Sequence, residues 1–107
     1  MILTRFLAAV ALAWAAAQPA FAQSNLKQGE MLLTRDCARC HAIGVAGTSP
    51  RPDAPAFRTL GTRYSIESLE EALGEGIMSG HPDMPEFRFD ADEVGAIIDF
   101  LKSIQQR

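Results

Sequence analysis

The sequence has few of the residues that cross-link small domains, bind metals or fill their cores with aromatic rings. Among 107 residues it has two cysteines, two histidines, one tryptophan and one tyrosine. Two cysteines cannot form the disulfide framework that many small domains use to compensate for a modest core. No internal repeat or block of like charges is present either. The length allows a single domain.

Positive charge is also scarce. Ten lysines and arginines stand against 13 aspartates and glutamates, which gives a net charge of −3. Nucleic-acid binding needs clustered basic side chains that neutralise phosphates. The balance therefore predicts that nucleic acid is not a partner.

Only one long hydrophobic run is present, at residues 6–17, and it is shorter than the ~20 residues that cross a bilayer. Arg5 precedes it, Pro19 follows it, and Ala20-Phe21-Ala22 has the small-x-small pattern that signal peptidase recognises. We expect residues 1–22 to be a cleaved secretory signal peptide and residues 23–107 to be the mature periplasmic domain, with no membrane span after cleavage. An uncleaved anchor is the alternative.

The mature part shows helical periodicity in three places. Apolar or small residues recur at spacings of three and four over residues 25–38 and again after Ser65, which is placed to cap a helix that Gly74 and Gly76 would end. The strongest pattern follows Asp90, where Glu93 has the capping-box spacing and the apolar residues of the last helix come next: Val94, Ile97, Ile98, Leu101 and Ile104.

The rest of the mature part is irregular. Residues 42–55 are rich in glycine, proline and serine, residues 56–60 suit a short helix, and residues 80–89 contain two more prolines. No segment alternates apolar and polar residues as a strand does. The sequence predicts an all-α fold of three main helices and long loops. Loops this long in so small a domain suggest that something holds them.

The chemistry-bearing motif is Cys37-Ala38-Arg39-Cys40-His41. This CxxCH spacing is the attachment sequence of c-type haem. Two thiols three positions apart at the end of a helix reach two vinyl groups on one porphyrin edge, and the following His41 is then placed beneath the iron. The motif uses both cysteines of the chain, and the export signal leads to the compartment where such haems are attached.

Three other interpretations of the motif remain. A disulfide is possible in an oxidising compartment, but a CxxC bond closes a very small loop and adds little stability. A thioredoxin-like redox pair would need a βαβ setting, for which the sequence has no strands. A zinc site would need about four ligands, and His81 is the remaining candidate beside the motif.

With these residues, the mature chain resembles the class I monohaem cytochromes c of bacteria. Gly29 lies eight residues before Cys37, and Leu33 lies four before it, as a glycine and a hydrophobic residue do in that family. The resemblance implies the cytochrome c fold around one covalent haem. It also implies that the N- and C-terminal helices cross at Gly29, against the aromatic Phe100.

The sixth iron ligand is predicted to be Met84. This residue lies between Pro82 and Pro85, which restrict the loop, and Met84-Pro85 resembles the Met-Pro that precedes the last helix in the family. Met31 is too close to the attachment motif to reach the opposite haem face. Met78 and His81 are the rival ligands, and a vacant sixth position is a further possibility.

The resemblance also assigns Pro55 a role, because a proline carbonyl after the CxxCH usually accepts the proton on the far nitrogen of the axial histidine. Pro50 and Pro52 are alternatives. An apolar haem wall is expected from Phe57, Leu60, Tyr64, Leu69, Leu73, Phe87 and Ile97.

Iron with two strong protein ligands lacks a site for substrate, so the predicted function is one-electron transport with His41/Met84 ligation rather than catalysis. The alternatives are a dedicated cytochrome subunit of a periplasmic dehydrogenase acting on sulfite, an alcohol or a similar molecule, and a gas-binding or peroxidase-like haem protein. The expected partners are periplasmic redox proteins: a dehydrogenase, an oxidase or a reductase.

The surface charge differs from that of mitochondrial cytochromes c, because their ring of lysines around the haem edge is missing. Five arginines either form a partial basic rim or are ordinary surface charge: Arg39, Arg51, Arg58, Arg63 and Arg88.

Overall fold

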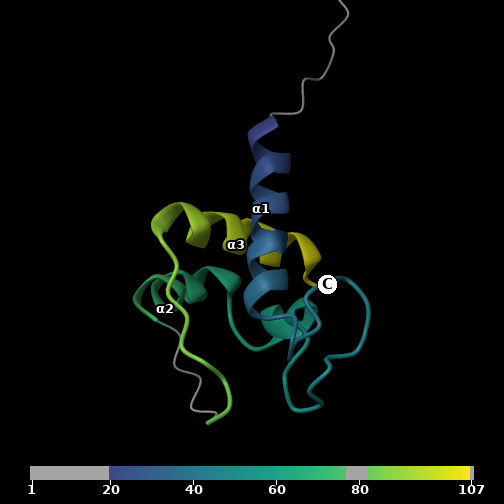
Figure 1. Ribbon diagram of the computed structural model, residues 1–107. Coiled ribbons are helices and arrows are strands. Elements are labelled where there is room, and N and C mark those ends of the chain that lie inside the picture. The colour runs from purple at the N-terminus through teal and green to yellow at the C-terminus, as the bar shows by residue number, and fades with distance from the viewer. Residues whose placement is uncertain (1–19, 77–81, 107) are drawn as a thin grey trace, which may run out of the picture.

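The computed structural model describes residues 20–76 and 82–106 (Figure 1). Its elements in chain order are α1 (Ala20–Asp36), η1 (Phe57–Thr62), η2 (Ile66–Ser68), α2 (Leu69–Glu75) and α3 (Ala91–Ile104). The described residues contain no strand, so the predicted all-α fold is confirmed. The expected signal-peptide cleavage point falls in the first turn of α1.

The fold is built on the crossing of α1 and α3 (Figure 1). Gly29 and Leu33 of α1 are buried at this crossing. A Cβ atom on Gly29 would overlap the carbonyl oxygen of Ala96 and would lie 2.8 Å from Cβ of Phe100. The missing side chain therefore lets the two backbones approach, and the expected crossing of the terminal helices at Gly29 and Phe100 is confirmed.

Helix α3 begins where the sequence places it, because its start is encoded locally. The Asp90 carboxylate accepts a hydrogen bond from the Glu93 amide at 2.8 Å, and the Glu93 carboxylate accepts one from the Asp90 amide at 3.1 Å. The apolar stripe of the helix is buried, as its spacing predicts: Val94, Ala96, Ile97, Ile98, Phe100, Leu101 and Ile104.

The second helix begins later than predicted, and it ends at the second of the two predicted glycines. Ser65 is the N-cap of η2, but its side chain makes no capping hydrogen bond, and α2 begins only at Leu69. Gly74 lies within α2, whereas Gly76, with φ of +119°, ends it. A side chain at Gly76 would also meet the Glu86 carboxylate. The left-handed backbone conformation and the close approach of residue 86 explain why glycine stands there.

The C-terminal end of α3 holds η1 in place through Gln105. The Gln105 side-chain amide donates to the Phe57 carbonyl at 2.8 Å, and its oxygen accepts from the Gly61 amide at 2.7 Å. The Gln106 amide adds a bond to the Arg58 carbonyl at 2.9 Å. The irregular segment between α1 and η1 is thereby anchored at both ends to the two crossing helices.

Candidate functional site

The CxxCH motif forms a hydrogen-bonded turn directly after α1. The Cys37 amide donates to the Leu33 carbonyl at 2.8 Å, which continues the helical pattern, and the His41 amide donates to the Cys37 carbonyl at 2.9 Å. Cys37 and Cys40 are free thiols and are partly buried. The two thiols thus follow the helix instead of lying on its last turn, and the turn brings His41 back beside Cys37.

The His41 ring is oriented by the chain that follows it. Its Nδ1 lies 2.8 Å from the carbonyl oxygen of Pro55. Because a carbonyl oxygen only accepts hydrogen bonds, Nδ1 carries the hydrogen and Nε2 keeps its lone pair for a metal. The Phe57 ring packs against the imidazole with 4.6 Å between ring centroids. The structure therefore brings His41 and Pro55 together, with Nε2 as the available ligand atom.

Two residues that were given no role at the haem site from the sequence fix the loop after the motif. The buried Ser49 hydroxyl accepts a hydrogen bond from the Ala42 amide at 2.9 Å. The Arg51 amide donates to the Cys40 carbonyl at 3.1 Å. Ser49 and Arg51 stand in a loop of glycine, proline and serine where no periodicity marks one position, so the sequence carries no signal for them.

Met84 lies in a turn of the segment that leads to α3, and it is partly buried. Its neighbour Asp83 receives a hydrogen bond from the Arg51 guanidinium at 2.7 Å. This ion pair links the Met84 turn to the loop that follows the attachment motif. The rival ligands Met78 and His81 lie outside the described residues.

Burial also affects the chemistry of Cys37. Desolvation, together with the smaller effects of the negative charges of Asp36 and Cys40, raises the pKa of the Cys37 thiol to about 11. At neutral pH the unmodified Cys37 side chain is therefore a protonated thiol. Within residues 20–76 and 82–106, no three His, Cys, Asp or Glu side chains gather into a metal site of their own. The zinc alternative depends on His81, which lies outside the described residues.

The predicted apolar wall is mostly in or against the core. Leu60, Leu73 and Ile97 are buried, whereas Tyr64 is 45% exposed. The remaining wall residues pack against the core while staying partly exposed: Phe57, Leu69 and Phe87. Phe89, which the prediction omitted, is buried and stacks with Phe87 at 6.4 Å between ring centroids.

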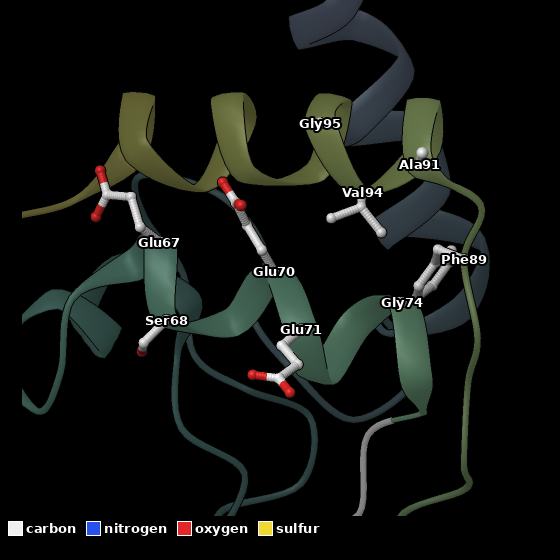
Figure 2. Close-up of a pocket in the computed structure, with 9 residues that line it drawn as sticks. All are labelled: Glu67, Ser68, Glu70, Glu71, Gly74, Phe89, Ala91, Val94 and Gly95. Carbon is white, nitrogen blue, oxygen red and sulfur yellow. The ribbon is translucent and has the colours of Figure 1, made fainter.

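A separate groove lies between α2 and α3, as Figure 2 shows. Its floor includes Phe89, Val94 and Gly95, and one side is acidic, with Glu70 reaching toward α3. The groove contains none of the predicted haem residues. Because it lacks them, the groove is not part of the candidate site.

Comparison with known families supplies the deciding observation. The family model described as cytochrome c oxidase, cbb3-type, subunit III matches residues 24–101. The chain belongs to this family of c-type cytochrome domains. Comparison with curated proteins gave no match, and comparison with solved structures gave none either.

Membership means that the domain carries a covalently bound haem c with its iron, transfers electrons, and works with redox partners. The described residues fit that cofactor: two free thiols at the CxxC spacing, and an imidazole with Nδ1 engaged and Nε2 available. When bound, the haem supplies the Fe(III)/Fe(II) couple. In the part of the chain that the structure describes, no helix is both long and apolar enough to cross a membrane.

Proposed function

We propose that this domain is a periplasmic one-electron carrier whose iron has His41 and Met84 as axial ligands. Cys37 and Cys40 hold the haem covalently, and the Pro55 carbonyl holds the His41 ring. The observation that carries the proposal is the 2.8 Å contact between Nδ1 of His41 and the Pro55 oxygen. That contact is the arrangement by which a protein orients an axial imidazole and raises its basicity.

The residues around the iron ligands perform binding and orientation rather than bond making. With the haem bound, His41 Nε2 and the Met84 thioether would both hold the iron, so a substrate would have no coordination site. Phe57 covers one side of the His41 ring and limits the access of water to it. A closed, dry site favours fast electron exchange because little around the iron has to move.

The test is a reversible redox titration of the purified holoprotein combined with exposure of the ferrous form to carbon monoxide. The proposal predicts a one-electron transition and a spectrum that carbon monoxide does not change. Rapid carbon monoxide binding would show an open or labile sixth position and would favour the gas-binding or peroxidase-like alternative.

A second candidate is a bound haem subunit of a larger oxidoreductase, which includes the dehydrogenase subunit considered from the sequence. The description of the matching family, which names an oxidase subunit, favours this candidate. The site chemistry is the same in both, and the difference is the lifetime of the complex with the partner. Stable co-purification of a catalytic subunit with the tagged chain would select the bound subunit, and its absence would select the free carrier.

Charge on the surface bears on how a partner docks. Of the arginines considered for a basic rim, Arg51 and Arg88 form ion pairs with neighbouring acids, and Arg58 donates to the Gly47 carbonyl at 2.8 Å. We propose that docking therefore depends little on a basic rim. The measurement is the rate of electron exchange with a partner at rising salt, and a steep fall would contradict this proposal.

Export is part of the same proposal. The expected cleavage after Ala22 would leave α1 starting at residue 23, well before the crossing at Gly29. The mature helix therefore keeps the part that contacts α3. N-terminal sequencing of protein from a periplasmic extract should begin at Gln23, and an intact Met1 in the membrane fraction would indicate an uncleaved anchor.

A further inference from the structure

Arg51 joins three segments that the proposed function needs. Its amide donates to the Cys40 carbonyl at 3.1 Å, inside the attachment motif. Its guanidinium Nε donates to Asp53 at 2.9 Å, two residues before Pro55. Its Nη2 donates to Asp83 at 2.7 Å, one residue before Met84.

The ion pair with Asp83 is a long-range contact, because 32 positions separate its partners. The other end of the Met84 segment is held by α2, since the Phe89 amide donates to the Leu73 carbonyl at 3.0 Å and the segment passes close to Gly76. The segment is therefore fixed by α2 near its end and by Arg51 near its beginning. Met84 lies beside the Arg51 attachment point.

We propose that Arg51 is a positioning residue for the sixth iron ligand. By tying the Met84 turn to the loop that holds His41, it slows the departure of the Met84 thioether from the iron. This inference rests on the proposed ligation by Met84. It adds a residue that contacts neither iron nor haem in the proposed arrangement and that acts through Asp83.

The chemistry of the guanidinium suits this task. Arginine presents several N–H donors in a planar fork, so one side chain can bind Asp53 and Asp83 at the same time. Lysine has a single compact charge and cannot reproduce both directions. The side chains of Arg51 and Asp83 are 37% and 59% exposed, so solvent screens the pair and the expected effect is modest.

The test measures how fast imidazole binds to the ferric holoprotein, because imidazole can bind only after Met84 leaves. Arg51→Gln and Asp83→Asn should each increase this rate by about two- to fivefold, as expected for loss of a surface ion pair. The double variant should be no faster than either single one, since both remove the same contact. Arg51→Lys should be intermediate. Arg88→Gln is the matched control: it removes an arginine that pairs with Glu86 in the same segment and should leave the rate unchanged.

The outcomes separate this inference from the proposed function. Met84→Ala should bind imidazole far faster than the unmodified protein; equal rates would show that Met84 is not the ligand, and the proposed function would fail first. If Met84→Ala behaves as expected but Arg51→Gln does not differ from the unmodified protein, the positioning role is wrong. An effect of Arg51→Gln without one of Asp83→Asn would also overturn it, because Arg51 would then act on another group, such as a haem carboxylate.

Discussion

Gly29 and Gly95 show how much a single missing side chain can matter in this domain. Both are helical glycines, one in α1 and one in α3. A Cβ on Gly29 would run into the Ala96 carbonyl and Phe100, whereas a Cβ on Gly95 would meet nothing within 4 Å. The two positions therefore separate the contribution of the helix crossing from the intrinsic cost of glycine in a helix.

We predict opposite effects of the same substitution at these positions. Gly29→Ala should lower the free energy of unfolding of the holoprotein by about 1–3 kcal/mol, because the backbones must separate. Gly95→Ala should raise it by about 0.5–1 kcal/mol, since alanine is the better helix former. Denaturant unfolding followed by circular dichroism measures both. Similar effects of the two variants would contradict the close crossing at Gly29.

The residue scale also shows what sequence can and cannot predict. Cys37, Cys40 and His41 are recognisable because their chemistry fixes their spacing, and Pro55 followed from the family resemblance. Ser49 was missed, and Arg51 was considered only as a surface charge. Their roles come from contacts with Asp83 and with the Ala42 amide, and these contacts exist only after the loops have folded.

At the scale of elements, local signals decided which boundaries were predictable. Asp90 starts α3 through a complete capping box, and both of its members are visible in four consecutive residues. Serine, like aspartate, is a favoured residue type at an N-cap, but the Ser65 side chain makes no capping hydrogen bond. A three-residue 3₁₀ turn, in which Ile66 is buried, intervenes before α2, and the sequence pattern does not distinguish such a turn from the start of an α-helix.

The two cap positions give a matched pair of variants. Asp90→Ala should destabilise the holoprotein by about 1 kcal/mol, because it leaves the Glu93 amide without its acceptor. Ser65→Ala should change the free energy of unfolding by only about 0.3 kcal/mol, since no capping hydrogen bond is lost. Thermal or denaturant unfolding at neutral pH measures the difference. An equal loss in both variants would mean that the capping box contributes little.

At the scale of the whole molecule, the covalent haem explains why long irregular loops are tolerated. The buried core comes largely from α1 and α3 together with single residues of the other elements, such as Leu60, Ile66 and Leu73. The segment between α1 and η1 is irregular and adds few core residues. A large apolar cofactor held by residues of two distant segments would supply the missing burial and cross-linking.

We therefore predict that the chain without haem is poorly folded. The variant Cys37→Ser/Cys40→Ser, produced without haem attachment, should give a narrow dispersion of amide signals in a proton–nitrogen NMR spectrum. The holoprotein should give well-dispersed signals under the same conditions, because ligand binding stabilises the folded state. A well-dispersed spectrum of the haem-free variant would show that the protein core suffices for folding.

The central claim is that Met84 is the sixth ligand of the haem iron, and the visible spectrum of the oxidised protein tests this claim most directly. We predict a low-spin c-type spectrum with a methionine–iron charge-transfer band that Met84→Ala abolishes. Met31→Ala should keep the band, since Met31 is 62% exposed on α1. A band that survives in Met84→Ala, or that is missing from the unmodified protein, would contradict the account.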